Sequence, residues 1–254
     1  MTMAIADRGD PIQFRENTLS AIRAAATSGA DMVRVDLRLS SDGYVVLLHD
    51  DTARRVWGRP EGAAGLSLAE IAALGCGDEQ RVPTLVEVLA EFGSRHALQF
   101  MLEVNSTDTA MAADDLVLEL GLDQKVVYTG SMAAMHALRS RRPDADLALT
   151  WDHPDTPDSE VWQTLRPCLF NVHHPLITRE MVAEAHVHGY QISAWTVNDF
   201  TEMARLLGMG LDAVVTEHPA ELAALARGQR SPETGREEQP SVTAAEAHPG
   251  RHTV

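Results

Sequence analysis

Short apolar, β-rich runs alternate along the chain with longer stretches whose apolar residues recur at helical spacing. This alternation predicts a parallel sheet whose strands are joined by crossover helices. Many of the helical stretches end in Gly, a common C-cap residue. The predicted strands cover 3–8, 32–39, 98–104, 125–130, 146–151, 169–174, 191–197 and 212–217, and the helices cover 16–29, 85–94, 112–121, 131–141, 159–167, 178–189, 199–210 and 219–228.

Eight strands and eight helices predict a closed (β/α)8 barrel, the TIM-barrel architecture of the α/β class. An open doubly wound sheet is the competing architecture. We expect residues 1–227 to form the barrel. The stretch 228–254 is rich in Pro, Gly and Glu and has no apolar period, which predicts a disordered C-terminal tail.

A β-hairpin extension is predicted after the second strand, where Asp42-Gly43 is followed by another β-type run. Asp-Gly is a strong signal for a two-residue hairpin turn. With these two residues as the turn, cross-strand partners sum to 85, so Asp36 would lie directly beside His49 on one face of the ribbon.

The charge of the chain restricts its partners. The formal net charge is −16, which excludes nucleic acid and anionic lipid as expected partners, because both require a basic surface. The sequence has no apolar run of about 18 residues and no signal-peptide pattern at its start, so we expect a cytoplasmic protein without a membrane span.

Cysteine and histidine spacing gives no zinc signature. Cys76 and Cys168 fit no metal or redox motif, and we expect two unpaired thiols rather than a disulfide. His153, His173, His174 and His218 show neither HxH nor HExxH spacing. His186 and His188 precede Gly189 and are expected at the surface or at a helix cap.

Carboxylates, arginines and one histidine collect at the predicted carboxyl ends of the first strands, the end at which barrel enzymes carry their active sites. Carboxylates repel one another in a cleft, so such a cluster predicts a divalent ion, a proton-transfer site or salt bridges to the arginines. The residues concerned are Asp7, Arg8, Arg34, Asp36, His49, Glu103 and Asn105, and later strand ends add Thr129, His153, His173, Trp195, Asn198, Glu217 and His218.

An ordered set of short motifs over about residues 4–220 resembles the glycerophosphodiester phosphodiesterase family. Residues 50–81 would then be a short form of the insertion that such enzymes carry. The motifs are Ala6-Asp7-Arg8-Gly9, Glu16-Asn17-Thr18, Gly29-Ala30-Asp31, Val33-Arg34-Val35-Asp36, Asp42-Gly43, His49-Asp50, the segment 82–89, Leu102-Glu103-Val104, Trp195-Thr196-Val197-Asn198 and Thr216-Glu217-His218-Pro219.

The resemblance implies hydrolysis of glycerophosphodiesters to glycerol phosphate and an alcohol, assisted by one divalent ion such as Mg²⁺ or Ca²⁺. Carried over residue by residue, it makes His49 a catalytic histidine and Arg8 a phosphate-binding arginine, which suits phosphate oxygens. It also places Trp195 at the wall of the substrate pocket. The implied metal-binding carboxylates are Glu16, Asp36 and Glu103.

Three positions depart from the family pattern. Asp7 stands where the family has a catalytic histidine, Arg34 stands where it has a metal-binding carboxylate, and Asn105 stands where it has a phosphate-binding lysine. The only lysine, Lys125, is expected at the opposite end of the barrel. Asp7 is then either an acid–base group or a partner of an arginine, while Arg34 and Asn105 are candidates for contact with substrate.

Arg34 leaves two arrangements open. In the first, Asp7 joins Asp36 and Glu103 around an ion while Arg34 turns to phosphate. In the second, the ion is lost, Arg34 pairs with Asp36 or Glu103, and Arg8 and Arg34 hold an anion unaided or form a buried salt bridge.

The leading hypothesis is a phosphodiester hydrolase that acts on a small phosphorylated substrate of the glycerophosphodiester type, and the three departures leave its efficiency and metal use open. Two alternatives remain. One is a metal-independent lyase or cyclase acting on a phosphorylated or otherwise anionic substrate, and the other is a barrel that binds an anion without catalysis.

Overall fold

The computed structural model describes residues 2–77, 80–93 and 97–228. Residues 229–254 of the predicted tail (228–254) lie outside the described residues. Gly228, the first residue of that prediction, is instead the last residue of the final helix. Among the described residues, no helix combines the length and apolar content needed to cross a lipid bilayer.

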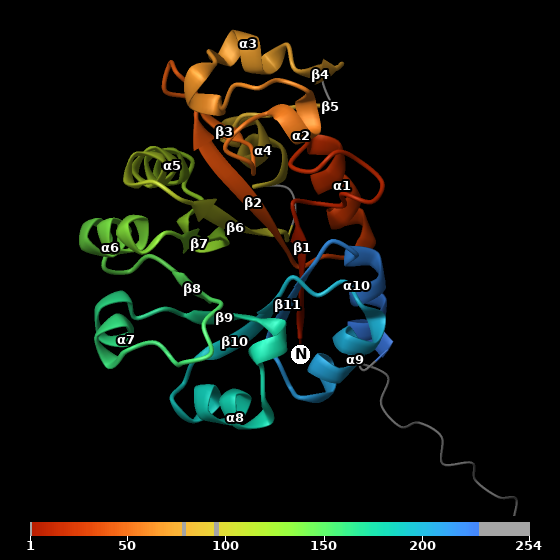
Figure 1. The fold of residues 1–254 in the computed structure, drawn as a ribbon, viewed down its shortest axis with the longest axis vertical. Helices are drawn as coiled ribbons and strands as arrows, with labels where there is room; N and C mark the ends of the chain where they lie inside the picture. Colours follow the sequence, from red (N-terminus) through yellow and green to blue (C-terminus); the bar gives the residue numbers. More distant parts are fainter. Residues whose placement is uncertain (1, 78–79, 94–96, 229–254) are drawn as a thin grey trace, which may run out of the picture.

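Eight parallel strands form a closed ring, which confirms the barrel and excludes the open doubly wound sheet (Figure 1). The strands follow one another around the ring in chain order, and a parallel bridge between Tyr128 and Leu147 joins the last two edges. In order, they are β1 (Met3–Asp7), β2 (Met32–Leu39), β6 (Gln99–Val104), β7 (Val126–Gly130), β8 (Ala148–Trp151), β9 (Leu169–His173), β10 (Gln191–Trp195) and β11 (Ala213–Thr216).

A ring of helices covers the outside of the barrel (Figure 1). Each predicted helix is present, and most begin at a Ser, Thr or Asp whose side chain accepts a hydrogen bond from a backbone N–H of the first turn. The helices are α1 (Leu19–Ser28), α4 (Leu85–Phe92), α5 (Thr107–Glu119), α6 (Met132–Arg141), α7 (Ser159–Leu165), α8 (Arg179–Val187), α9 (Phe200–Gly208) and α10 (Pro219–Gly228).

The hairpin extension and the insertion lie together at one side of the barrel (Figure 1). The extension is strand β3 (Val45–Leu47), which pairs antiparallel with β2. The insertion contains elements that the sequence pattern did not predict, and it packs its own small apolar cluster around Val46, Leu66 and Ile71. These elements are α2 (Arg54–Trp57), α3 (Leu68–Ala72), β4 (Gly75–Cys76) and β5 (Gln80–Arg81).

Two separate apolar clusters build the barrel. The larger one joins strand residues to helix residues, so it fills the space between the sheet and the helical ring. The smaller one contains strand residues only, among them Ile5, Met32, Met101 and Leu169, and it fills the interior of the barrel. Successive side chains on a strand alternate between these two cores, so the next inward position on each strand lies nearer the mouth.

Candidate functional site

The side chains inside the barrel change from apolar to polar towards the carboxyl ends of the strands. The change comes at the next inward-facing residue of each strand after the small apolar cluster. Asp7, Arg34 and Glu103 follow Ile5, Met32 and Met101 by two residues on β1, β2 and β6, and therefore share their face. Strand register completes the arrangement, because Asp7 is the partner of Arg34, and Asp36 is the partner of Glu103. The sequence prediction that these residues converge at one end of the barrel is confirmed.

Arg34 lies at the centre of this cluster and contacts all three carboxylates. Its Nη1 lies 2.5 Å from Oδ1 of Asp7, and its Nη2 lies 3.3 Å from Oδ1 of Asp36. Nη2 also contacts Oε2 of Glu103. Asp7 and Asp36 are almost fully buried, with side-chain exposures of 1% and 2%.

The ion pairs keep both partners charged despite their burial. Burial alone would raise the pKa of Asp36, but Arg34 and Arg8 outweigh it and hold that pKa below its ordinary value. Burial alone would lower the pKa of Arg34, and the adjacent Asp7 and Asp36 raise it instead. Among the described residues, every partner of the Arg34 side chain is a carboxylate. Its predicted contact with phosphate stays a prediction.

Each of the three carboxylates directs one oxygen at Arg34 and is held by an uncharged side chain through the other. Oδ2 of Asp7 accepts a hydrogen bond from Thr196 at 3.1 Å. Oδ2 of Asp36 accepts one from Asn17 at 2.9 Å, and Oε1 of Glu103 accepts one from Asn105 at 3.1 Å. Asn105, predicted to contact substrate, thus orients Glu103 in this structure.

The loop after β1 brings Arg8 over the same cluster. Its Nε lies 3.2 Å from Oδ2 of Asp36, and its Nη1 lies 3.4 Å from Oε2 of Glu16. The backbone of Arg8 has a positive φ of 59°, which is rare for a residue other than Gly and recurs at functional sites. Its N–H donates to the carbonyl of Arg34, and its carbonyl accepts from the N–H of Asn17, so the loop is fixed at both sides.

His49 does not lie directly opposite Asp36, so this part of the hairpin prediction was wrong. The observed partners, such as Leu37 with Leu47, sum to 84, and Leu48 rather than His49 donates its N–H to the carbonyl of Asp36. The reason is the turn: Ser40 pairs with Tyr44 around a three-residue loop that ends in Gly43 at a φ of 85°. A longer loop with a final left-handed Gly shifts the register by one residue.

The partner of His49 is instead its neighbour in sequence. Nδ1 of His49 lies 2.7 Å from Oδ1 of Asp50, and Arg55 of α2 holds Asp50 with its Nε 2.7 Å from Oδ2. The hydrogen bond from Arg55 is the largest cause that lowers the pKa of Asp50, so Asp50 is a carboxylate at neutral pH. A carboxylate at Nδ1 fixes the proton there and leaves Nε2 as an acceptor. Nε2 has no hydrogen-bond partner within the described ranges.

Strands β7 to β10 carry a row of uncharged polar side chains. Thr129, Thr150, Asn171 and Ser193 form a hydrogen-bonded row across β7 to β10, with distances of 2.8 Å, 3.1 Å and 2.8 Å between successive side chains. Trp195 donates its indole N–H to the carbonyl of Asn171 and packs partly against the interior apolar cluster. Its ring also lies 5.3 Å from that of His173. The predicted place of Trp195 at the wall of a substrate pocket stays a prediction.

The donor oxygens do not fit the divalent ion that the resemblance implies. A Ca²⁺ or Mg²⁺ ion needs carboxylate oxygens at about 2.0–2.6 Å. The oxygens of Asp7, Asp36 and Glu103 that face a common point already face Arg34. Two like unit charges 4 Å apart repel by about 4 kcal/mol at an intermediate dielectric, and a divalent ion by about twice that.

Glu16, the third carboxylate predicted to bind the metal ion, is also paired with arginine. It accepts hydrogen bonds from Arg55 at 2.6 and 2.9 Å and lies near Arg8. Across the described part of the chain, no group of three or more His, Cys, Asp or Glu residues is arranged to hold a metal.

The remaining candidates lie outside this cluster. His153 pairs with Asp152 at the surface, and His186 pairs with Asp212. Cys168 is a free thiol, as expected, and burial raises its pKa to about 11. Lys125 precedes β7, so it lies at the opposite end of the barrel, as predicted, and its Nζ donates to the carbonyl of Gly93 at 2.5 Å.

Sequence reasoning missed four residues that shape the site. Asn17, Asp50 and Thr196 lie within the family-like motifs, but the resemblance predicted no function for any of them. Arg55 lies in the insertion, where no motif pointed to it. The local signal for Asp50 was its position directly after His49, which a short-range pairing rule would have found.

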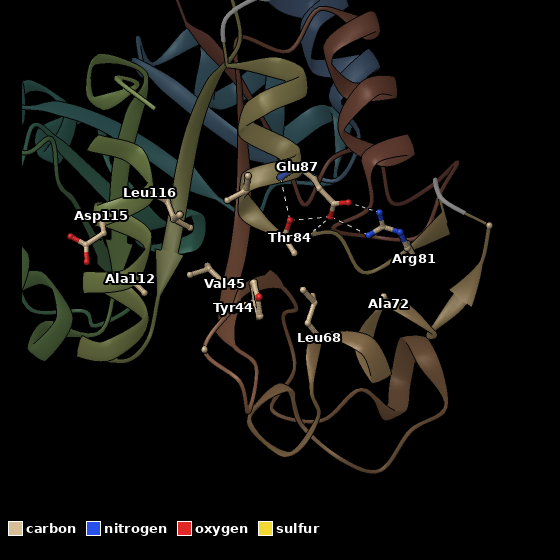
Figure 2. A pocket seen from close by; sticks show the side chains of 13 residues that line it. Tyr44, Val45, Leu68, Ala72, Arg81, Thr84, Glu87, Ala112, Asp115 and Leu116 are labelled. Carbon is tan, nitrogen blue, oxygen red and sulfur yellow. Dashed lines mark hydrogen bonds and ion pairs between the residues drawn. The ribbon is translucent and has the colours of Figure 1, made fainter. Parts of the chain in front are cut away.

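A large cavity of the described structure lies away from this cluster. It has a volume of about 890 Å³ and is bounded by the hairpin, α3, α4 and α5 (Figure 2). Tyr44, Leu68 and Leu116 give it a mainly apolar lining, and the Arg81–Glu87 ion pair lies at its edge (Figure 2). None of the residues predicted for catalysis or metal binding lines it, so chemistry and cavity size point to different places. We place the site at the barrel mouth, where the charged groups converge.

Known proteins with similar sequences span most of the chain. A glycerophosphodiester phosphodiesterase of Caldanaerobacter subterraneus is 26% identical over 247 residues, covering 89% of this chain and 98% of that protein. A putative glycerophosphodiester phosphodiesterase of Bacillus subtilis is also 26% identical, covering 85% of this chain and 94% of its own length.

Solved structures show the same fold. A putative glycerophosphoryl diester phosphodiesterase from Silicibacter pomeroyi superimposes with a TM-score of 0.82 at 21% identity, covering 91% of this chain and 94% of its own. An Oleispira antarctica phosphodiesterase, solved in complex with the product sn-glycerol-3-phosphate, gives a TM-score of 0.81 at 23% identity, covering 89% and 97%.

The model of the glycerophosphoryl diester phosphodiesterase family matches residues 8–221, a range that contains most of the motifs singled out above. It begins at Arg8 and includes Arg34, Asp36, His49 and Glu103. The match therefore covers most of the strands and the whole of the insertion. The chain belongs to the glycerophosphoryl diester phosphodiesterase family.

Proposed function

We propose that this protein hydrolyses small glycerophosphodiesters, with His49 as the acid–base group. Family membership and relatives named as glycerophosphodiester phosphodiesterases support the reaction class. The observation that carries the assignment of His49 is its 2.7 Å contact with Asp50, which Arg55 in turn holds. A carboxylate behind an imidazole is the arrangement that prepares a histidine to accept and return a proton.

The proposed role of each group follows from its contacts. Nε2 of His49 takes a proton from the attacking water as the new oxygen–phosphorus bond forms, and His49 then gives that proton to the leaving alcohol oxygen as the old oxygen–phosphorus bond breaks. Asp50 keeps the imidazole ring in the required orientation. Asp7 is held by Arg34 and Thr196, which favours its role as an arginine partner over one in proton transfer.

Arg8 is the proposed phosphate-binding group. Its Nη1 donates to Glu16 and its Nε lies 3.2 Å from Asp36 without forming a hydrogen bond, whereas Nη2 has no partner among residues 2–77, 80–93 and 97–228. A guanidinium placed between two carboxylates in this way has one nitrogen left to donate to a phosphate oxygen. We place Trp195 against the glycerol end of the substrate, and we further propose a cytoplasmic role in the breakdown of lipid-derived phosphodiesters.

The test is turnover of glycerophosphocholine and glycerophosphoethanolamine, measured as release of glycerol phosphate. We expect turnover in the wild-type protein and a loss of about 100-fold or more in His49→Ala, because acid–base catalysis contributes about 10²–10⁴-fold. His153→Ala is the matched control, since His153 is exposed and lies outside the cluster. Phosphorus NMR of the products separates the alternatives.

Each alternative has its own outcome. A cyclic phosphate as the final product would replace the hydrolase with a cyclase. Binding of glycerol phosphate with no turnover above His49→Ala would leave a barrel that only binds anions.

A further inference from the structure

Every carboxylate that the family resemblance assigns to a metal ion forms an ion pair with one of three arginines. Arg34 contacts Asp36 and Glu103, Arg8 lies 3.2 Å from Asp36, and Arg55 donates to Glu16 at 2.6 Å. These arginines are fixed parts of the chain, from β2, the β1 loop and the insertion. The positive charge that offsets this acidic cluster is thus supplied by the protein itself.

The three carboxylates around Arg34, here called the cage, share one feature with metal ligands, although with Arg34 in place they are not arranged to hold a metal ion. Asp7, Asp36 and Glu103 each point one oxygen at the guanidinium, and each is oriented from behind by a neutral side chain through the other oxygen. Metal-binding carboxylates are held in this way by outer hydrogen bonds. Here the convergent oxygens surround a side chain.

Asp36 shows that the guanidinium fills this cage imperfectly. Its Oδ1 is buried and makes no hydrogen bond to any described residue, although it lies 3.3 Å from Nη2 of Arg34. The N–H bonds of a planar guanidinium point in fixed directions, and none of them is aligned with Oδ1 of Asp36. A spherical ion has no such directional restriction.

We propose that Arg34 is the resident cation of this site, that the wild-type protein takes up no divalent ion there, and that removing the guanidinium exposes a latent site for one divalent cation formed by Asp7, Asp36 and Glu103. The inference rests on the proposed function only in that it names the cation of the same site. Because its test measures cation binding, the result stands whether or not the proposed hydrolysis is found.

The experiment compares the wild-type protein with Arg34→Ala by calorimetric titration with Ca²⁺, Mg²⁺ and Mn²⁺, and by thermal unfolding with each ion or with chelator. We expect no binding and an unchanged Tm for the wild-type protein. We expect Arg34→Ala to bind one ion per chain and to gain at least ~5 °C in Tm, because a ligand that binds only the folded state stabilises it.

Arg142→Ala is the matched control. It also removes a guanidinium from a buried carboxylate, Asp114 at 2.9 Å, while the other carboxylates near Arg142 are 3.9 Å away. We expect it to lose stability and to gain none of it back with divalent ions. An equal gain in Arg142→Ala would mean that unpaired carboxylates bind cations without any cage.

A second variant covers the case in which Arg34→Ala fails to fold. Arg34→Gln keeps an amide donor near the carboxylates and removes the charge, and the same gain in Tm with a divalent ion is expected. Binding of a divalent ion by the wild-type protein that is lost in Asp36→Asn would overturn the proposal. Failure of both variants to gain stability or to fold with any ion would also overturn it.

Discussion

His49 and Asp50 are adjacent in sequence, and the imidazole of the first contacts the carboxylate of the second at 2.7 Å. The pair lies just after β3, where the chain leaves the hairpin. A short-range pair of this kind depends little on the register of the strands, so the one-residue shift between expected and observed hairpin leaves it intact. Arg55 connects the pair to the insertion.

Asp50→Asn is expected to lower kcat by at least about 10-fold while leaving KM nearly unchanged, because it removes the negative charge that fixes the proton on Nδ1 of His49 and leaves Arg8 in place. Steady-state kinetics with a glycerophosphodiester measure both constants. The matched control is Asp51→Asn, whose side chain is 97% exposed. Equal losses in the two variants would mean that local charge, and not orientation of His49, sets the rate.

Asn17 joins an unusual backbone to a buried hydrogen bond. Its φ is 57°, and its side chain donates to Asp36 at 2.9 Å. Asn17→Gly removes the hydrogen bond and relaxes the backbone, whereas Asn17→Ala removes the bond and keeps the strain. We expect losses of about 1–3 kcal/mol in unfolding free energy, with Ala the worse by about 1 kcal/mol. Urea unfolding checks this order, and a more stable Ala variant would contradict it.

Gly9 and Gly43 have nearly the same positive φ, 89° and 85°, in very different surroundings. A Cβ on Gly9 would lie 2.5 Å from the backbone carbon of Ala21 in α1, while a Cβ on Gly43 would meet nothing within 4 Å. We expect Gly43→Ala to cost about 1 kcal/mol and Gly9→Ala about 3 kcal/mol or more. Denaturant unfolding of both variants measures the difference, and equal costs would show that α1 moves away without penalty.

Ionised Glu202 is expected to contribute to the loss of folding stability at low pH. Hydrogen bonds from Arg205 and His174 lower its pKa to about 2. A carboxyl whose pKa is depressed on folding stabilises the protein above its ordinary pKa of 4.5, and that contribution is lost as the pH falls from 4.5 towards 2. Glu202→Gln should lower Tm at neutral pH by roughly 2–4 °C, and its Tm should fall less steeply than that of the wild-type protein as the pH drops from 4.5 towards 2.

The control for Glu202 is Glu184→Gln on α8, an exposed helix carboxylate. Thermal unfolding across the acid range compares the two variants. If Tm falls as steeply with decreasing pH in Glu202→Gln as in the wild-type protein, other carboxyl groups cause the loss of stability.

Restoring the three departing family residues together tests the site from the opposite direction. The variant Asp7→His, Arg34→Glu, Asn105→Lys replaces the central guanidinium by a carboxylate and adds a lysine at the mouth. We expect hydrolysis by this variant to require a divalent ion and to be lost with chelator, whereas wild-type turnover is unaffected by it. Chelator sensitivity of the wild-type protein, removed by substituting Glu16, would contradict this expectation.

The barrel could be predicted from the sequence because its signal is local. Each strand and crossover helix has its own apolar period, and caps such as Thr84 and Ser131 mark where helices begin. Helix α5 starts earlier than predicted because Ser106 caps it at Thr107, ahead of the apolar run. The insertion was not predicted because its helices are too short for a period.

The residues of the site could be named, but their pairing could not be derived. Strand ends identified Asp7, Arg34, Asp36 and Glu103, since parallel strands bring their carboxyl ends together. Whether Arg34 faces solvent or its neighbours depends on rotamers that no sequence period encodes. The hairpin register failed for a similar reason, because Asp42-Gly43 suits loops of two and of three residues.

The neutral row of Thr129, Thr150, Asn171 and Ser193 differs from the charged cluster around Arg34 in the expected cost of a substitution. Thr129, Asn171 and Ser193 are almost fully buried, so a substitution in the row leaves a neutral partner without its hydrogen bond, at a cost of about 1–3 kcal/mol. A substitution among Arg34 and its carboxylates instead leaves a buried charge unpaired, which costs about 3–5 kcal/mol. Sequence change should therefore be tolerated more readily in the row on β7 to β10 than in the charged cluster on β1, β2 and β6.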